Sequence, residues 1–303
     1  MVEDQGAHCC LIANPAAGRG RAARVVGAVR ELLHGRGIHN IRLSEHPGHE
    51  RELARDAAAS GARTIIALGG DGTWSNVARG IIDAASDTRL ALIAAGTGND
   101  LAFGAGLHAH DAAAMVDAAL GQSTRRIDVG RVDSVHFVNV AGFGIDPIVL
   151  EASRRVTWLR GHAVYLVTAA RKLFSYDGTN VSLAIDDGAA DGRERMLALV
   201  VSNGPRFGGG FLIAPNASLF DAALDVVTVR DASPLRRAIL LAGATRGMHV
   251  RAPEVRVRNA RRARIDFDAP PLFDADGDLF QATSSSVEIA ILPSRLPLAV
   301  PPR

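Results

Sequence analysis

The chain has 303 residues and 48% hydrophobic content, enough for a sizeable core, so two domains are the default expectation. Its 34 basic residues nearly balance its 32 acidic residues, which argues against bulk electrostatic binding to nucleic acid. The two cysteines, Cys9 and Cys10, are adjacent in an apolar run, which excludes a disulfide framework and fits a reducing compartment. No apolar run reaches the length of a membrane span, so we expect a soluble, cytoplasmic protein.

The first 121 residues alternate short apolar strands with single helices. This order predicts a doubly wound α/β domain, in which a parallel sheet is covered on both faces and binds ligands at the carboxyl ends of its strands. We expect strands over Cys9–Ala13, Ile41–Ser44, Thr64–Leu68 and Leu90–Ala95, and helices around Val25–Leu33 and over His49–Ser60, Trp74–Ala84 and Asp111–Gly121.

After Gly121 the pattern changes to strands with few helices between them, which predicts an antiparallel second domain. Residues Pro147–Tyr176 read as one long helix or as two helices broken near Gly161. We place a nucleotide-binding domain at 1–130 and a second domain at 131–292, with 293–303 either ending the second domain or returning to the first. The expected strands are Ile127–Val132, Val135–Val140, Val181–Asp186, Met196–Ser202, Leu224–Arg230, Val255–Arg258, Ala263–Phe267 and Val287–Leu292.

The most informative loop is Gly69-Gly70-Asp71-Gly72-Thr73, which joins an expected strand to an expected helix. Its glycines let backbone N–H groups approach a phosphate, and the following helix points its positive end at the same place. A second acidic loop, Gly96-Thr97-Gly98-Asn99-Asp100, follows the next strand. Asp71 and Asp100 are therefore candidates for binding magnesium that is carried by nucleotide phosphates.

A third loop, Asn14-Pro15-Ala16-Ala17-Gly18, follows the first strand and precedes Arg19 and Arg21. Lys172 is the only lysine, so a P-loop lysine cannot be built, and arginine would have to grip a nucleotide phosphate. A plain connecting loop explains this stretch equally well. Since all three loops follow parallel strands, we expect them at one edge of the sheet.

Three stretches in the second half of the chain also contain candidate residues for binding or catalysis. The run Asn203–Phe211 holds three successive glycines, which suits close backbone approach better than a neutral loop. Ser218, Asp221 and Ala223 offer oxygen ligands for a hard cation, although an ordinary turn explains them nearly as well. The run Asp274–Asp278 reads as a turn, and one of its carboxylates could accept a proton from an alcohol.

Taken together, these motifs resemble the lipid-kinase family that contains diacylglycerol kinases and sphingosine kinases. The resemblance spans nearly the whole chain, through the three glycine loops, Asn203–Phe211 with Ala214–Ala217, and Asp276-Gly277-Asp278. It implies a nucleotide-binding α/β domain, a β-sandwich-like lipid domain, and transfer of the γ-phosphate of ATP to a lipid hydroxyl in a cleft between them.

The resemblance assigns ATP binding to Asn14–Gly18, Ser44, Gly70–Asn76 (including Trp74 and Ser75) and Thr97, and magnesium to Ser218, Asp221 and Ala223. It places the proton acceptor in the Asp276–Asp278 turn. The chain departs from the family pattern where Asn76 and Asp278 replace glutamates, Ala94 replaces a proline and Ala222 replaces a glycine.

Asp276 or Asp278 is the preferred base, because the helix terminus beside Asp71 favours its ionised form and suits metal binding better. Asp71 remains a second candidate. The basic and apolar residues of Pro147–Tyr176 fit either contact with an anionic membrane or ordinary packing on the second domain.

The expected function is Mg-ATP-dependent phosphorylation of diacylglycerol to phosphatidic acid, as in phospholipid biosynthesis, by a cytoplasmic protein that associates peripherally with membrane. Sphingoid-base or ceramide phosphorylation is the alternative within the same class. A soluble-metabolite kinase such as an NAD kinase is a further alternative among enzymes. A nucleotide- or lipid-binding regulator without turnover is the alternative of a different class. We expect no nucleic-acid partner and leave a homodimer open.

Overall fold

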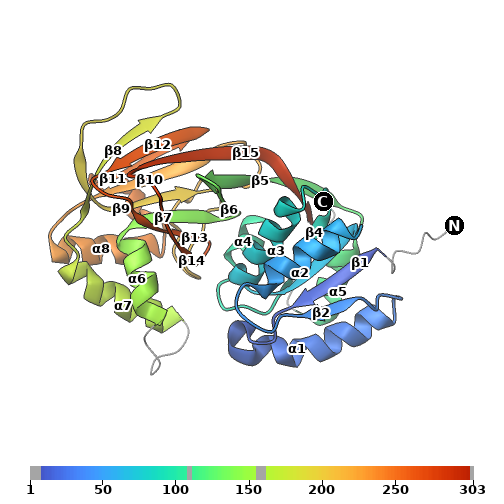
Figure 1. The fold of residues 1–303 in the computed structure, drawn as a ribbon. Coiled ribbons are helices and arrows are strands. Elements are labelled where there is room, and N and C mark those ends of the chain that lie inside the picture. Colours follow the sequence, from blue (N-terminus) through green and yellow to red (C-terminus); the bar gives the residue numbers. More distant parts are fainter. Residues whose placement is uncertain (1–7, 108–110, 155–161, 301–303) are drawn as a thin grey trace. The chain divides into compact units, whose positions relative to one another are not determined.

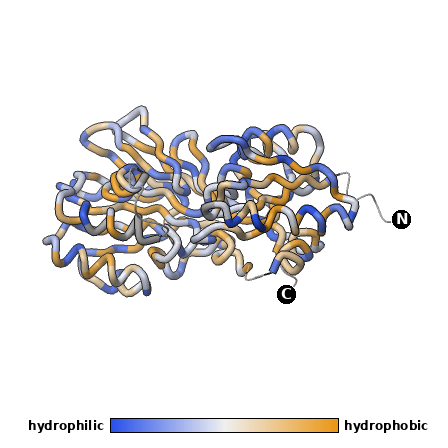
Figure 2. The backbone as a smooth tube through the Cα atoms, turned by 90° about the horizontal axis from the view of Figure 1, so that it is seen from below, coloured by the Kyte–Doolittle hydropathy of each residue, from blue (hydrophilic) through white to orange (hydrophobic). Residues whose placement is uncertain are grey.

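A computed structural model describes residues 8–107, 111–154 and 162–300. The chain forms two compact units, which are residues 1–127 with 294–303 (unit 1) and residues 128–293 (unit 2). Two strands continue from one unit into the other, namely β5 (Thr124–Val132) and β15 (Ser286–Ala299). Hydrophobic and hydrophilic stretches alternate along the backbone throughout the chain (Figure 2). The central strands of each unit are among the buried hydrophobic stretches.

Unit 1 is built on a parallel sheet in the order β15-β4-β3-β1-β2 (Figure 1). The central strands are almost completely buried apolar runs, as expected for a sheet covered on both faces. Register places Leu68 beside Ala13 on one side and beside Ile93 on the other, so these strands end level with one another. The strands are β1 (Cys9–Ala13), β2 (Ile41–Leu43), β3 (Thr64–Gly69) and β4 (Arg89–Ala94).

Helices cover both faces of this sheet (Figure 1). On one face, α1 (Ala17–His34) and α5 (Ala112–Leu120) bury apolar side chains against alternate residues of the strands. On the other face, α2 (His49–Ala59) packs closely on α3 (Asp71–Asp83), because a Cβ at Gly80 would lie 2.3 Å from the carbonyl oxygen of Arg51. The short helix α4 (Asp100–Gly104) follows β4. The predicted doubly wound α/β domain is confirmed.

Unit 2 is a mainly antiparallel β-sandwich-like structure, as predicted. One group of strands runs β14-β13-β7-β9-β10-β11, and β8, β12, β15, β5 and β6 form the other. Between them lies an apolar core in which Phe143 stacks near Phe267 and Phe273, with ring centroids 5.4 and 5.6 Å away. The remaining strands are β6 (Val135–Phe137), β7 (Val140–Gly144), β8 (Thr179–Ile185), β9 (Glu194–Ser202), β10 (Leu224–Arg230), β11 (Val255–Ala260), β12 (Arg262–Phe267), β13 (Leu272–Ala275) and β14 (Asp278–Gln281).

Helices pack on the outer side of β7, β9 and β10 through a second apolar cluster. They are α6 (Ile145–Arg154), α7 (His162–Ser175) and α8 (Pro234–Ala244), and the 3-10 helix η1 (Met248–Arg251) follows α8. Residues Ile145–Arg154 and His162–Ser175 are helical as expected, whereas the break predicted near Gly161 lies outside the described residues. The helix α8 was not predicted. Among the described residues, no helix is both long and apolar enough to cross a membrane.

Gly130 in β5 tests how tightly the sandwich core is packed. A Cβ at this position would lie 2.1 to 2.5 Å from three ring carbons of Phe137, whose side chain is fully buried. We expect Gly130→Ala to lower the free energy of unfolding by about 1–3 kcal/mol. The control is Gly27→Ala in α1, where a Cβ meets nothing within 4 Å. It should raise stability by about 0.5–1 kcal/mol, because alanine favours the helix. Urea unfolding of both variants measures the difference, and equal midpoints would contradict the close packing.

Candidate functional site

The three predicted loops of unit 1 meet at the carboxyl edge of its sheet. Gly18 adopts a left-handed φ of 58°, and a Cβ there would lie 2.1 Å from the carbonyl oxygen of Ala95. The loop after β1 is therefore seated directly on the end of β4. The side chain of Arg21 also reaches this loop, because its Nη1 donates to the carbonyl oxygen of Gly96 at 3.0 Å.

The loops after β3 and β4 touch through their glycine backbones. A Cβ on Gly70 would lie 2.8 Å from the Cα of Gly96, and a Cβ on Gly96 would lie 2.4 Å from the Cα of Gly70. No residue larger than glycine fits at either position without movement of the backbone. The predicted convergence of three loops at one edge is therefore present in the structure.

Asp71 begins α3, and its carboxylate bridges two of these loops. Its Oδ1 accepts the backbone N–H of Leu101 at 3.1 Å. Burial, followed by the negative charge of Asp100, raises the pKa of Asp71 to about 6, although backbone N–H groups of residues 99 to 101 oppose the shift. The helix terminus alone would favour the charged form, as predicted from the sequence, but burial has the larger effect.

Not every predicted ATP-binding side chain faces outward. The side chains of Thr73, Trp74 and Ser75 are buried, and Trp74 donates from Nε1 to the carbonyl oxygen of Ala67 at 3.1 Å. These side chains therefore pack inside unit 1, and the bond of Trp74 ties the start of α3 to β3. The side chains of Pro15, Asp71, Asn76 and Asn99 are partly exposed, as is the backbone of Gly98, whereas Gly72 and Thr97 are exposed. The side chain of Arg19 lies outside the described residues.

Glu50 is a residue that the sequence analysis missed. Its Oε1 accepts hydrogen bonds from Asn14 Nδ2 at 2.6 Å and from Ser44 Oγ at 3.2 Å, so it joins two of the predicted ATP-binding positions. The side chain is only 2% exposed, and Oε2 has no hydrogen-bond partner among the described residues. Asn14 Oδ1 in turn accepts the N–H of Ala16 at 2.9 Å, which shapes the loop. An acidic residue in the first turn of α2, six residues after Ser44, was the available signal.

In unit 2 the predicted Asp276-Gly277 turn joins β13 to β14. Both turn residues have positive φ, 51° and 89°, as in the tight hairpin turn that Asp-Gly sequences favour. The carboxylate of Asp276 is buried and accepts three backbone N–H groups, from Val138 at 2.8 Å and from Asn139 and Val140 at 2.9 Å. These bonds fix the strand connection before β7 and occupy three of the roughly four lone-pair sites of the carboxylate.

Asp278 differs from its neighbours because its side chain is partly exposed at the start of β14. Asp274, on the other side of the turn, is fully buried, and its Oδ1 accepts the N–H of Gly277 at 2.8 Å. Burial, followed by the charges of Asp146 and Asp276, raises the pKa of Asp274 well above its usual range. Of the carboxylates in this turn, only that of Asp278 belongs to a residue that is partly exposed.

The predicted metal ligands lie in one turn of unit 2 before β10. The Oδ1 of Asp221 accepts the N–H of Ala223 at 3.2 Å, and Ser218 Oγ accepts the N–H of Phe220 at 3.3 Å. Asp128, which the sequence analysis did not single out, supports this turn by accepting the N–H of Ala222 at 2.7 Å.

Asp225, further along the same segment, has its pKa raised to about 6 by burial and then by the charge of Asp221. The donor set is all oxygen, as a hard cation requires, and added positive charge would relieve the repulsion between these carboxylates. Among the described residues, no cluster of three or more His, Cys, Asp or Glu side chains is arranged to hold a metal ion. A bound ion would therefore need carbonyl, hydroxyl or water ligands besides Asp221.

Two family models match the chain in order. The model described as "Diacylglycerol kinase catalytic domain" matches residues 8–132, and the one described as "YegS C-terminal NAD kinase beta sandwich-like domain" matches residues 139–300. The chain is 30% identical over 301 residues to a "Diacylglycerol kinase" of Mycobacterium tuberculosis, covering 96% of this chain and 94% of the relative.

A "Probable lipid kinase YegS-like" of Pseudomonas putida is 31% identical over 278 residues, covering 90% of this chain and 92% of the relative. The fold is similar to that of a solved diacylglycerol kinase structure from Bacillus anthracis, with a TM-score of 0.71 and 19% identity over 97% of both chains. With both family models in their expected order and relatives that cover nearly its whole length, the chain belongs to the lipid-kinase family of diacylglycerol kinases and YegS-like kinases.

Proposed function

We propose that this protein transfers the γ-phosphate of ATP to the hydroxyl group of diacylglycerol, giving phosphatidic acid. The observation that carries the proposal is the contact between Gly70 and Gly96, with the loop of Gly18 seated beside them. Three backbone segments that leave the ends of parallel strands form one set of closely packed loops at the start of α3. Such a set, at the start of a helix, is suited to a polyphosphate.

Arginine and backbone groups take the place of the lysine found in P-loop enzymes. Lys172 is the only lysine, and it lies in unit 2. In unit 1, Arg21 is fixed against the loop after β4 by its bond to Gly96. Its charge and the positive end of α3 would stabilise the negative charge that spreads over the transferred phosphoryl group. Glu50 would keep Asn14 and Ser44 in place beside the nucleotide.

Magnesium fits two places in this proposal. Asp71 and Asp100 would bind the ion that accompanies the nucleotide phosphates, directly or through water. In unit 2, Ser218, Asp221 and Ala223 would hold a second ion, with Asp128 supporting their turn. Magnesium supplies positive charge that offsets repulsion between phosphate and carboxylate oxygens.

We assign proton removal from the lipid hydroxyl to Asp278. The carboxylate of Asp276 already accepts three backbone N–H groups, whereas Asp278 is partly exposed at the edge of the same turn. A carboxylate at hydrogen-bond distance from the attacking hydroxyl is the arrangement that general-base catalysis needs. Asp276 is then a positioning residue that sets the turn on which Asp278 stands.

Diacylglycerol is the proposed acceptor because the mycobacterial relative, which matches over nearly its whole length, is named a diacylglycerol kinase. Such an acceptor is held in a bilayer, so the enzyme would work while associated peripherally with the membrane.

The first test measures transfer of labelled phosphate from ATP, with and without magnesium, to diacylglycerol, ceramide and a sphingoid base. Diacylglycerol should be phosphorylated fastest, and chelation of magnesium should stop the transfer, because the phosphate charge is then left without its cation. Faster transfer to ceramide or a sphingoid base would replace the proposed acceptor. Measurable ATP binding without transfer to any lipid would instead favour a regulator without turnover.

Two matched substitutions separate the base from the residue that positions it. Asp278→Asn should lower kcat by roughly 10²–10⁴-fold at an unchanged free energy of unfolding, because it removes only the proton acceptor. Asp278→Glu should restore much of the activity, since it keeps a carboxylate. Asp276→Asn should instead cost about 2–4 kcal/mol of stability, because an amide cannot accept all three N–H groups. A stable but inactive Asp276→Asn protein alongside an active Asp278→Asn protein would reverse the assignment.

Asp71 should contribute to function at the expense of stability. Its folded pKa of about 6 exceeds the usual value of 3.8, so the folded state favours the protonated carboxyl. The contribution of this carboxyl group to the free energy of unfolding is complete below pH 4, and it is lost as the pH rises through 6. In nucleotide-free, metal-free buffer, Asp71→Asn should raise the free energy of unfolding by about 1–3 kcal/mol at pH 7.5 and have little effect at pH 4. Its phosphotransfer activity should fall. A variant less stable at pH 7.5 than the unmodified protein would contradict this account.

A further inference from the structure

The helices on the outer side of unit 2 expose apolar side chains that a solvated surface would not need. Among the described residues, eight large hydrophobic side chains are exposed, and five of them belong to α7, α8 and η1. The exposed fractions reach 73% for Leu235 and 67% for Phe174. The five are Val167, Phe174, Leu235, Ile239 and Met248, which we call the apolar face.

The outward side of α8 is apolar over its whole length. Leu235 and Ile239 are one turn apart and exposed, whereas Arg237 and Leu240 point to the interior and are buried. An ordinary surface helix has the opposite pattern, with polar residues outside. An exposed apolar face of this kind marks an interaction site.

Specific contacts hold these helices together as one surface. Arg237 is buried in α8 and donates from Nη1 to the carbonyl oxygens of Leu173 at 2.6 Å and Tyr176 at 2.8 Å, which ties α8 to the end of α7. Figure 1 shows α7 and α8 on the same side of unit 2. On the other side of α8, a Cβ at Gly243 would lie 3.2 Å from the backbone nitrogen of His249 in η1, so the 3-10 helix also packs closely.

The charge around the apolar face is positive. No Asp or Glu occurs between residues 152 and 176 or between residues 232 and 252. Arg171 lies between Val167 and Phe174 on the exposed side of α7, and Arg246 and Arg251 are exposed beside Met248. In the part of the chain that the structure describes, no carboxylate forms an ion pair with these three arginines.

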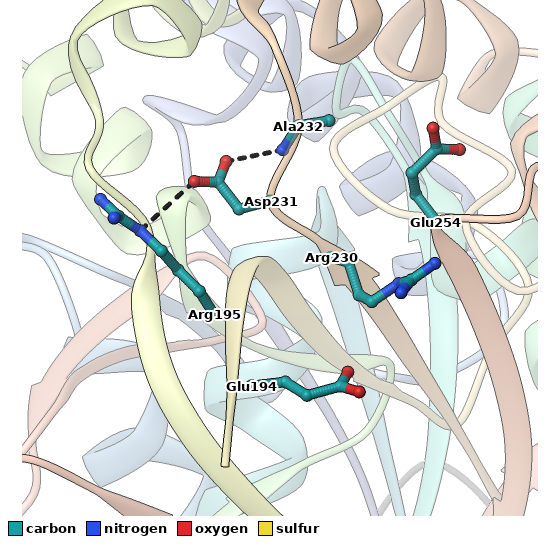
Figure 3. Close-up of a pocket in the computed structure, with 6 residues that line it drawn as sticks. All are labelled: Glu194, Arg195, Arg230, Asp231, Ala232 and Glu254. Atoms are coloured by element: carbon teal, nitrogen blue, oxygen red, sulfur yellow. Dashed lines mark hydrogen bonds and ion pairs between the residues drawn. The ribbon is translucent and has the colours of Figure 1, made fainter. Parts of the chain in front are cut away.

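The acids next to the start of α8 are already paired with arginines. Arg195 pairs with Asp231 at 3.3 Å in a pocket of about 590 Å³. Figure 3 draws the residues that line this pocket. Asp231 also accepts from Nε of the buried Arg237 at 3.0 Å. Glu254, on the same pocket, receives two bonds from Arg236 at 2.8 and 2.9 Å. These pairs leave the exposed arginines to determine the charge that the face presents.

We propose that the apolar face, with Arg171, Arg246 and Arg251, docks unit 2 onto an anionic phospholipid bilayer. The apolar side chains enter the boundary between headgroups and acyl chains, and the arginines meet the negative lipid headgroups. Charge complementarity selects this partner over a neutral membrane. The inference rests on the proposed lipid-kinase function only for the reason that the protein would bind a membrane.

Vesicle sedimentation without nucleotide tests the docking apart from catalysis. The intact protein should bind phosphatidylglycerol-containing vesicles more tightly than pure phosphatidylcholine vesicles, and added salt should weaken the binding. The double variant Leu235→Ser/Ile239→Ser should bind the anionic vesicles at least about tenfold more weakly. Leu43→Ser, at a 47% exposed residue of unit 1, is the matched control and should bind normally.

A second pair of double variants tests whether the positive charge of the arginines contributes to vesicle binding. Arg171→Gln/Arg251→Gln should weaken binding and its salt dependence, whereas Arg24→Gln/Arg30→Gln on the exposed side of α1 should not. All variants should keep the urea midpoint of the intact protein, and the serine pair should keep its turnover of a soluble short-chain diacylglycerol. Unchanged vesicle binding by the serine pair would overturn the proposal. So would a dimer of the intact protein that the serine pair converts to monomer, because the face would then join two copies of the chain.

Discussion

The site in unit 1 depends on the absence of side chains at Gly70 and Gly96. Strands β3 and β4 run in parallel with Gly69 beside Ala94, and the N–H of Ala95 donates to the carbonyl oxygen of Gly69 at 2.7 Å. The chains that leave these strands must therefore pass each other at backbone distance. Glycine at both positions makes this possible, and it brings the backbones of the two loops into direct contact. The proposed binding of a phosphate here would therefore depend on backbone groups and need few side chains.

The sequence was sufficient to place the three loops and the two kinds of fold. Short apolar strands separated by single helices leave little choice but a parallel sheet, and the glycines in the loops after β1, β3 and β4 predict that these loops approach one another closely. Roles that depend on distant partners could not be predicted. The role of Asp276 is set by the N–H groups of residues 138 to 140, more than 130 residues away in sequence. The raised pKa of Asp71 comes mainly from burial, and the neighbouring residues in the sequence do not predict how deeply this side chain is buried.

The missed helix α8 has a different explanation. Ser233 followed by Pro234 is a helix-start signal, and it was present in the sequence. The apolar residues of α8 lie on both its inner and outer sides, so they do not form the single stripe by which a surface helix is recognised. The same property that hides the helix from sequence analysis makes its outer side available for docking. Local sequence rules fail at this helix because its apolar residues serve both packing on unit 2 and the proposed docking.

The path of β15 has a consequence for how the chain is made. The fifth strand of the unit 1 sheet comes from this late segment, where Leu298 pairs with Leu90 of β4. During synthesis the other four strands emerge first, and β4 remains an unprotected edge until the ribosome has passed residue 298. Unit 1 is thus the first to begin folding and the last to be completed, and a nascent chain stalled inside unit 2 would carry an open sheet edge prone to aggregation.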